Sequence, residues 1–380
     1  MREWDAIIVG AGPAGAALAR RLRPRHRVLL LERPPGPAAG ARIGESLPGA
    51  ARVLLQRLGI HEDFLAQGHV QRGAALAQWE SSTPAWFDAV RDPHGPGWHL
   101  DRRRFDAGLR TAAVAAGAAL LDSARQVAVA HEDGGWRVDI ECAGPYCAAP
   151  SRQTHRAPVL VDASGRGMAA ARQLGLARRG QDRLICLYAH LPADPLDEDQ
   201  ATRVCADRNG WWYSVRVPSG QRVLALHLDG DDAERKALRD PARLMAKARG
   251  HALFADLRPA TMDLAVHAQP AGGGGLVPAA LAALPPGFFA IGDAMLAFDP
   301  IASQGLFNAL ATAESAAAAI ERHLDGADDA RERYLDEMGA VQARYCQRLR
   351  ETYAAVTRYA GERFWRRRTG ASDAAGIFAA

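Results

Sequence analysis

A glycine-rich turn near the start of the chain has the spacing of a phosphate-binding loop. It reads Gly10-Ala-Gly12-Pro13-Ala14-Gly15 and lies between two apolar runs, residues 5–9 and 27–31. Gly10 permits a tight turn from strand to helix, and Gly12 lets backbone N–H groups approach a pyrophosphate at the helix N-terminus. Gly15 lets the helix pack closely against the strand. The motif therefore predicts a site for a dinucleotide.

An acidic residue, Glu32, closes the second apolar run. It follows the glycines by about 20 positions, where a carboxylate accepts hydrogen bonds from a ribose hydroxyl. An acid at this place disfavours a 2′-phosphate. The next residue, Arg33, is assigned to the same site. The motif alone does not separate FAD from NAD.

Two later segments add polar turns after predicted elements. A loop that contains Gly44, Glu45 and Ser46 precedes a helical stretch. A strand over residues 158–162 ends in Asp162-Ala-Ser-Gly165. Turns that follow parallel strands gather at one edge of a sheet, where ligands of such folds bind.

A third segment joins a strand, a turn and a helix N-terminus. The strand over residues 287–291 is followed by Gly292-Asp293 and by a loop that begins at Pro300 and leads into an alanine-rich helix. A helix N-terminus offers free N–H groups and the positive end of the helix dipole. Such a place suits an electron-rich ring whose reduced form is negatively charged.

Together, these segments resemble the flavin monooxygenase superfamily, which contains aromatic hydroxylases, flavin-dependent halogenases and geranylgeranyl-reductase-like proteins. The resemblance covers most of residues 1–325 and implies FAD as the cofactor. It places Gly292-Asp293 at the ribityl and ribose part of FAD and residues 300–308 along the flavin ring. It also assigns Arg102 to cofactor support, although a salt bridge at a helix N-terminus is the alternative. The predicted FAD-binding residues are Gly10, Gly12, Pro13, Ala14, Gly15, Glu32, Arg33, Gly44, Glu45, Ser46, Arg102, Asp162, Gly165, Gly292, Asp293, Pro300, Gln304, Gly305, Leu306 and Asn308.

Within that superfamily, residues 44–48, 97–102 and 292–308 look closest to the tryptophan-halogenase-like branch. The branch includes flavoproteins that hydroxylate or mature tryptophan-derived quinone cofactors inside partner proteins. The resemblance favours a monooxygenase in which reduced FAD and O₂ form a C4a-hydroperoxide, whose terminal oxygen passes to an electron-rich indole-like or phenol-like ring. The substrate is an aromatic small molecule or a polypeptide that carries tryptophan or tyrosine.

Two features disfavour halogenation. The tryptophan halogenases that this chain resembles use a lysine near the substrate, whereas Lys236 and Lys247 are its only lysines and lie in polar helical stretches. Arginine cannot replace that lysine because its guanidinium stays protonated. The halogenase signature Trp-x-Trp-x-Ile-Pro is also altered here, with Tyr213 in place of the second Trp and Arg216 in place of Pro. Halogenase and FAD-dependent reductase or dehydrogenase stay as alternatives.

A second domain is predicted from alternating strands over residues 184–191, 212–217, 222–228 and 262–268. The candidate catalytic bases are His190, His227 and His267, because imidazole titrates near neutral pH; a merely hydrogen-bonded strand histidine is the alternative for each. The candidates for stacking on an aromatic substrate are Trp211, Trp212 and Tyr213, with a hydrophobic core as the alternative.

These elements predict an α/β fold in which an FAD-binding, Rossmann-like parallel-sheet domain carries an inserted mixed β-sheet substrate domain and C-terminal helices. The FAD-binding domain is assigned to residues 1–70, 100–182 and 276–325, and the substrate domain to residues 71–99 and 183–275. Residues 326–380 form the helical C-terminal segment, and residues 272–275, four glycines, are expected to be a flexible linker.

Composition narrows the class of protein. The chain has 380 residues and a formal net charge of +4, without the concentrated basic face of a nucleic-acid binder. No run of about 18 apolar residues predicts a membrane span. Five scattered cysteines complete no zinc site and indicate reduced thiols in the cytoplasm. No separate nicotinamide motif is evident, which leaves a separate flavin reductase open as the electron source.

Overall fold

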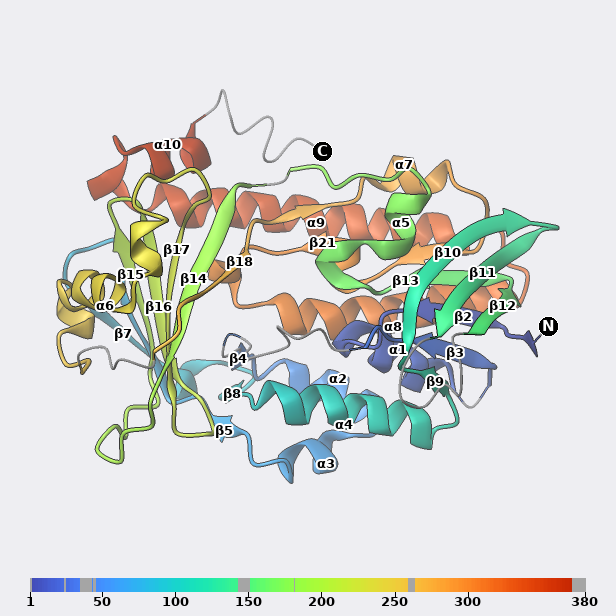
Figure 1. Cartoon of the computed structure of the whole chain (residues 1–380), viewed down its shortest axis with the longest axis horizontal. Coiled ribbons are helices and arrows are strands. Elements are labelled where there is room, and N and C mark those ends of the chain that lie inside the picture. Colours follow the sequence, from blue (N-terminus) through green and yellow to red (C-terminus); the bar gives the residue numbers. More distant parts are fainter. Residues whose placement is uncertain are drawn as a thin grey trace.

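Two large sheets lie at opposite ends of the molecule, and the long helices extend from one end toward the other (Figure 1). The computed structural model describes residues 2–23, 25–34, 43, 46–142, 151–180, 182–258 and 264–370. One sheet has five strands and contains the glycine-rich turn. The other has seven strands and forms the left side of Figure 1.

The five-stranded sheet is parallel throughout, and its order is β20-β13-β2-β3-β9. Its apolar strands are buried on both faces, as parallel sheets require, because helices and a four-stranded sheet cover them. Helix α1 (Pro13–Leu22) packs against α4 (Arg102–Ala115) and α8 (Gly305–Leu324). The strands are β2 (Ala6–Val9), β3 (Val28–Leu31), β9 (Ala119–Leu121), β13 (Val159–Asp162) and β20 (Phe288–Ala290).

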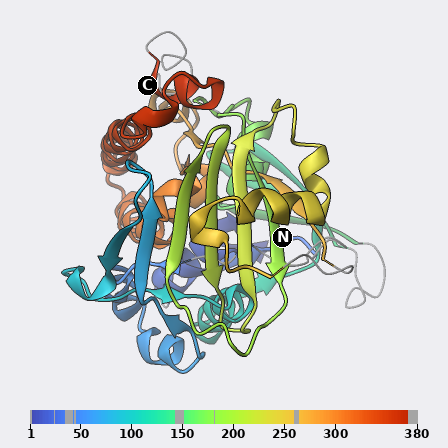
Figure 2. The same ribbon diagram turned by 90° about the vertical axis from the view of Figure 1, so that its left-hand side faces the viewer.

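The seven-stranded sheet is mixed: β15 and β6 run parallel, and every other neighbouring pair is antiparallel. Alternate side chains enter two different cores. Helix α6 (Pro241–Arg249) lies across the outer face, which is turned toward the viewer in Figure 2. In sheet order, the strands are β18 (His267–Pro270), β14 (Leu184–Leu191), β17 (Arg222–Asp229), β16 (Gly210–Arg216), β15 (Thr202–Asp207), β6 (Ala74–Gln78) and β7 (Ala85–Asp88).

The C-terminal helices connect the two sheets. Helix α9 (Ala330–Ala354) packs against α8 at one end and approaches the inner face of the seven-stranded sheet at the other. Helix α10 (Arg363–Thr369) is anchored to the protein by Trp365 and Arg368, which are both fully buried.

The remaining elements are β1 (Arg2–Glu3), β4 (Ser46–Leu47), α2 (Ala51–Arg57), α3 (His61–Leu65), β5 (Val70–Gln71), β8 (Trp98–His99), β10 (Ala124–Glu132), β11 (Gly135–Cys142), β12 (Ser151–Ala157), α5 (Ala169–Gln173), β19 (Gly274–Gly275), α7 (Pro278–Ala282) and β21 (Leu296–Ala297). Among them, β1, β12, β11 and β10 form the four-stranded sheet in that order, and the others are short.

The predicted fold class is confirmed: a parallel-sheet domain, a separate mixed sheet and C-terminal helices are all present. The seven strands come from residues 74–88 and 184–270, which lie within the segments predicted for the substrate domain. The domain boundaries themselves stay a prediction. The strand expected over residues 262–268 differs, because residues 264–266 are not extended into the sheet and β18 begins at His267.

Residues 272–275 are packed, contrary to the flexible linker predicted from composition. A Cβ placed on Gly272 would lie 2.1 Å from the Asp182 carbonyl oxygen, and one on Gly273 would lie 2.7 Å from the Tyr345 hydroxyl. Glycine is needed here because two chain segments and α9 meet too closely for any side chain. We call this place, where residues 179–180 and 182–183 run beside residues 272–275, the neck.

Candidate functional site

The glycine-rich turn, the turn after β13 and the start of α8 enclose a cavity of about 680 Å³. We call it the nucleotide cavity. Gly10 and Gly15 pack against the protein, since a Cβ on either would come within 3.0 Å of backbone atoms. The residues predicted from sequence that line it are Gly10, Gly12, Pro13, Ala14, Glu32, Arg33, Arg102, Gly165, Asp293, Gly305 and Leu306.

Four glycines in the cavity wall leave their Cβ positions open. A Cβ placed on Gly12, Gly165, Gly167 or Gly305 meets nothing within 4 Å. At Gly12 and Gly305 the opening lies at the N-terminus of α1 and of α8, where free backbone N–H groups gather. A dinucleotide can therefore approach the backbone closely, and the residues present fit FAD.

Charge in the nucleotide cavity is mostly positive. One Glu32 oxygen accepts a hydrogen bond from the Ala11 N–H at 2.5 Å, which holds the carboxylate at the rim. Arg102 lines the cavity and forms an ion pair with Asp106 at 3.2 Å, so the cofactor role and the helix-end salt bridge are compatible. Sequence reasoning missed three further cavity arginines, Arg110, Arg125 and Arg172. Of these, only Arg110 could have been predicted from the sequence. It follows Arg102 by eight residues, just over two helical turns, so the two side chains lie near one face of the helix.

The Asp162 carboxylate does not line the cavity and is occupied by the protein. It accepts hydrogen bonds from the Ser164 backbone and hydroxyl and from the N–H groups of Ala170 and Ala171. It therefore shapes the turn and caps α5, which corrects the predicted direct contact with FAD. Asn308 is likewise structural, because its side-chain amide donates to the Leu296 carbonyl at 2.9 Å.

A second cavity of about 550 Å³ lies between the inner face of the seven-stranded sheet and the start of α8. We call it the sheet-side cavity. It shares Asp293, Gly305 and Leu306 with the nucleotide cavity, so one extended ligand can occupy both. Six more residues predicted from sequence form part of its wall: Ser46, Trp211, Tyr213, His227, Pro300 and Gln304.

Gly292-Asp293 stands at the junction of the two cavities. The Gly292 N–H donates to the Thr312 hydroxyl at 2.8 Å, and its φ of 55° is one that favours glycine. The Asp293 carboxylate lies 3.2 Å from the Arg166 guanidinium. Gly44 and Glu45 lie outside the described residues.

All three candidate histidines point toward the inner face of the sheet, but only His227 lines the sheet-side cavity. Its ring stacks on Trp211 with centroids 3.7 Å apart, and burial lowers the pKa of His227 to about 3. His190 and His267 flank Tyr188 instead, and the strand that carries His267 is exposed. A neutral His227 can orient a substrate, but it is a weak base.

The three aromatic candidates divide between the faces of β16. Trp211 and Tyr213 line the sheet-side cavity, whereas Trp212 points into the core beneath α6 and donates to Asp207 at 2.8 Å. Alternation along a strand makes this division unavoidable. Trp212 therefore does not face the sheet-side cavity, and its predicted contact with the substrate is replaced by a place in the core.

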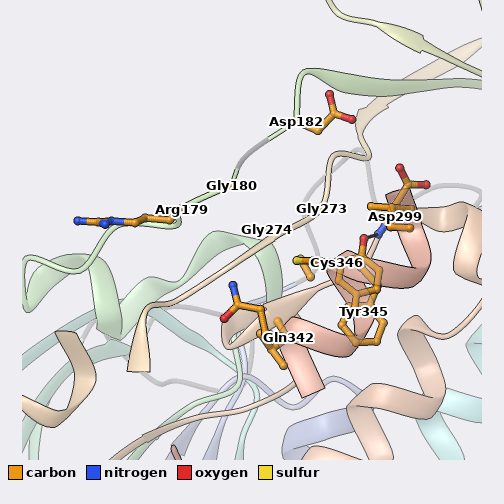
Figure 3. A pocket seen from close by; sticks show the side chains of 13 residues that line it. Arg179, Gly180, Asp182, Gly273, Gly274, Asp299, Gln342, Tyr345 and Cys346 are labelled. Carbon is orange, nitrogen blue, oxygen red and sulfur yellow. Dashed lines mark hydrogen bonds between the residues drawn. The ribbon is translucent and has the colours of Figure 1, made fainter. Parts of the chain in front are cut away.

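Sequence reasoning also missed Asp299, a carboxyl that is 1% exposed in the wall of the sheet-side cavity. Burial, the largest cause, raises the pKa of Asp299 to about 6. Asp299 also borders a third cavity of about 20 Å³ beside the neck, which we call the small cavity. Figure 3 presents this cavity with Asp182 and Asp299 above Tyr345 and Cys346.

Cys205, His251 and Asp207 resemble a nucleophile with its base and orienting acid, but they lie on the outer side of the seven-stranded sheet, away from the sheet-side cavity. The Cys205 sulfur is 3.5 Å from Nδ1 of His251, whose Nε2 is 3.2 Å from Asp207. Burial raises the pKa of the Cys205 thiol to about 12, and a thiol is a weak nucleophile without its thiolate. Within the described residues, no group of His, Cys, Asp or Glu is arranged to hold a metal ion.

Neither lysine lies near the cavities. Lys247 is on α6, across the sheet, and its ammonium is 2.8 Å from Glu234. Lys236 directly precedes a short turn on the same outer side. Among the helices of the described chain, none has both the length and the apolar character to cross a bilayer.

Comparison with known proteins places this geometry in a family. A family model described as an FAD-binding domain matches residues 3–248. LodB of Marinomonas mediterranea, described as an FAD-dependent oxidoreductase, is 28% identical over 97% of both chains. The structure of CmlS, a flavin-dependent halogenase, has a TM-score of 0.78 at 24% identity. The matched region covers 97% of this chain and 68% of the CmlS chain.

A second solved structure, QhpG, is a peptidyl tryptophan dihydroxylase essential for tryptophylquinone cofactor biogenesis. It has a TM-score of 0.76 at 23% identity and covers 98% of this chain and 80% of its own. The family model confirms the FAD-binding family expected from the sequence, and the two solved structures share the fold of this chain.

Proposed function

The chain belongs to the family of proteins with an FAD-binding domain, and from this premise we propose that it is a monooxygenase that hydroxylates an electron-rich aromatic side chain of a partner polypeptide. The coarser statement, an FAD-dependent oxidoreductase, follows from the family. The observation that supports hydroxylation of an aromatic side chain is the sheet-side cavity. This cavity adjoins the nucleotide cavity and is lined by stacked aromatic rings.

FAD, when bound, supplies the activation of O₂ and the electrons for transferring one oxygen atom to an aromatic ring. The residues assigned to hold its nucleotide half are Gly12, Glu32, Arg33 and Arg102, with Gly165 opening the wall. The helix N-terminus at Gly305 offers N–H donors to the flavin end. These assignments are proposals from the cavity geometry.

The protein's contribution at the reacting end is position and exclusion of water. Trp211, Tyr213 and His227 give an electron-rich ring flat partners on one side of the sheet-side cavity. The neutral imidazole of His227 offers either a donor or an acceptor to a substrate N–H or O–H group. Binding of a ring there closes the reacting centre to water.

The charges around the sheet-side cavity favour a residue within a polypeptide over a free amino acid. Arg166 is the cation among its described lining residues, and this arginine already pairs with Asp293 and donates to the Phe298 carbonyl. A free amino acid would bring a carboxylate without a partner, and burial of an unpaired charge is strongly unfavourable. An aromatic residue inside a chain carries neither terminal charge. The likeness to QhpG, which dihydroxylates a peptidyl tryptophan, agrees with this choice.

Halogenation is the second candidate, because the likeness to CmlS favours it as far as fold goes. The position of Lys247 on the outer side of the sheet disfavours it. We further propose a cytoplasmic location, which the free thiols of Cys186, Cys205 and Cys346 support, and a separate flavin reductase as the electron source.

The experiment is to supply the FAD-loaded protein with a chemical or enzymatic source of electrons, O₂ and either a tryptophan-bearing peptide or free tryptophan, with and without bromide. Mass spectrometry should find a gain of one oxygen atom in the peptide, little change in free tryptophan and no bromine. Bromine in either product would show that the protein is a halogenase and would reject the proposed hydroxylation. An unchanged peptide together with hydroxylated free tryptophan would reject the polypeptide substrate.

A further inference from the structure

Asp299 belongs to the walls of two cavities at once. It faces the sheet-side cavity with Trp211 and His227, and it faces the small cavity with Asp182 and Tyr345 (Figure 3). The small cavity has about 20 Å³ of space, which is enough for about one water molecule where polar partners are present. A buried carboxyl thus stands between the proposed reacting centre and a water-sized space that Asp182 and Tyr345 border.

Three hydrogen bonds, two with α9 and one with the turn that Asp299 begins, fix the position of this residue. Its Oδ2 accepts from the Tyr353 hydroxyl at 2.8 Å, and its Oδ1 accepts from the Ile301 N–H at 2.9 Å. Its own N–H donates to the Tyr345 hydroxyl at 2.6 Å. The Tyr353 oxygen also accepts from Nε1 of Trp211 at 3.2 Å, so the carboxyl is linked through Tyr353 to an aromatic residue in the wall of the sheet-side cavity.

The titratable and charged groups that face Asp299 are Asp182, Arg368, Tyr345 and Tyr353. Burial raises the pKa of Asp299 to about 6, Asp182 adds to this, and Arg368 and the Tyr353 hydrogen bond oppose it. At pH 7, about a tenth of such carboxyls are protonated. Asp299 can therefore both give and take a proton near neutral pH.

Hydroxylation of an aromatic C–H group needs a proton in this cavity. The balance is RH + O₂ + 2e⁻ + 2H⁺ → ROH + H₂O. Two electrons and one proton arrive with anionic reduced FAD, so the second proton must come from the protein. Building on the proposed function, we propose that Asp299 gives this proton to the oxygen atom that leaves as water and is reprotonated by a proton from solvent, relayed by a water molecule in the small cavity that returns to its neutral form. One carboxyl O–H bond breaks in the first step and re-forms in the second.

The other ionisable groups of the described wall are poorly suited to this role. The pKa of His227 is lowered to about 3 by burial, so the ring holds no spare proton at pH 7. The Asp293 carboxylate is already engaged by the Arg166 guanidinium at 3.2 Å. An arginine does not release its proton in proteins.

Infrared spectra of the FAD-bound protein test the titration without any aromatic substrate. In the wild type, the C=O band of a protonated carboxyl should disappear as the pH rises through about 6, and D299N should lack that change. The rate at which O₂ reoxidises photoreduced, bound FAD should have an inflection at the same pH, because that reaction also consumes one proton. In D299N the rate at pH 7 should fall at least about tenfold and lose the inflection.

Tyr353→Phe removes one hydrogen bond that favours the ionised form, so the infrared and kinetic inflections should move to higher pH. D194N, a variant of a carboxyl that pairs with Arg258 on the surface, should leave both unchanged. A band or rate inflection that persists near pH 6 in D299N would overturn the proposal. If D299N does not retain FAD, the test passes to Tyr353→Phe. Infrared and kinetic inflections at the wild-type pH in that variant would then overturn the proposal. None of these readouts needs hydroxylation, so a failure of the proposed function is seen separately.

Discussion

At the residue scale, the glycines of this chain fulfil opposite requirements. Those of the nucleotide cavity face open space, and Gly12 is the clearest case because nothing lies within 4 Å of its Cβ position. Those of the neck face atoms, as at Gly272, where a Cβ would lie 2.1 Å from a carbonyl oxygen. The same residue type therefore leaves room for a ligand in one place and for the protein's own backbone in another.

Gly12→Val should weaken FAD binding by at least about tenfold, or about 1.4 kcal/mol, because the new side chain enters the nucleotide cavity rather than the core. Titration of the apoprotein with FAD, followed by flavin fluorescence, measures this. Gly361→Ala is the matched control, since its Cβ also meets nothing within 4 Å but lies near α10. Equal affinity in Gly12→Val and the wild type would contradict the assignment of the cavity.

His227→Phe should keep the flat partner for Trp211 and remove both ring nitrogens. We expect kcat/KM for the peptide to fall about tenfold, the loss of one hydrogen bond, while FAD affinity stays the same. Trp212→Phe is the comparison, because this ring packs under α6 on the other face of the sheet. It should lower stability without lowering kcat/KM. An unaltered kcat/KM in His227→Phe would remove His227 from the site.

The sequence predicted the parts of the site that are local. The glycine turn and Glu32 follow one βαβ unit, whose spacing determines backbone geometry directly. Asp162 and Trp212 were misassigned because the direction of a side chain depends on which face of a strand is covered. Asp299 was missed as a functional group because its burial arises from α9 and α10, more than 40 residues away. Position along the chain carries no signal for that.

At the element scale, α10 anchors the C-terminal end of the described chain, and its buried arginine is paired with carboxylates of the protein. Arg368 is fully buried, lies 2.7 Å from Asp182 and 2.9 Å from Asp229, and stacks over Phe364 at 3.7 Å. The helix therefore joins the ends of β14 and β17 to the C-terminus by a buried ion pair that sits beside the neck.

Arg368→Met should destabilise the protein by about 3–5 kcal/mol, because it leaves Asp182 buried without its cation. Chemical denaturation measures the difference. Arg366→Met, on the exposed side of the same helix, should change the free energy of unfolding by less than about 0.5 kcal/mol. Similar losses in both variants would mean that helix propensity, and not the buried pair, explains the effect.

The neck can be tested in the same assay. Gly273→Ala places a Cβ 2.7 Å from the Tyr345 hydroxyl and should cost about 1–3 kcal/mol. Gly339→Ala lies in the interior of α9, where its Cβ comes no closer than 3.7 Å to Pro278, so it should stabilise the protein by up to about 1 kcal/mol. A flexible neck would instead tolerate the first substitution without loss.

At the scale of the whole molecule, the buried Asp299 makes stability depend on pH. Its pKa is raised from 3.8 to about 6, so between these values the folded protein holds a proton that the unfolded chain has released. Stability should therefore fall by about 3 kcal/mol as the pH rises from about 4 to about 6, at about 1.4 kcal/mol for each pKa unit.

Urea denaturation at a series of pH values measures this dependence, and D299N should be flatter over the same range. Asp207 contributes with the opposite sign, because hydrogen bonds from His251 and Trp212 lower the pKa of Asp207 to about 2 against the burial that raises it. Its stabilisation is present above about pH 4 and is lost as the pH falls toward 2. An identical slope in D299N and the wild type would show that Asp299 is ionised in the folded state.

The seven-stranded sheet also determines when this chain can finish folding on the ribosome. Strand β6 pairs in parallel with β15, more than 120 residues later in synthesis, and β20 joins the five-stranded sheet only at Phe288. A nascent chain therefore carries the β6–β7 hairpin with one edge of β6 unpaired until β15 has emerged, and such edges are where aggregation begins. The arrangement that brings two distant segments together over one cavity makes completion of the fold a late, non-local event and gives chaperones a long window in which to act.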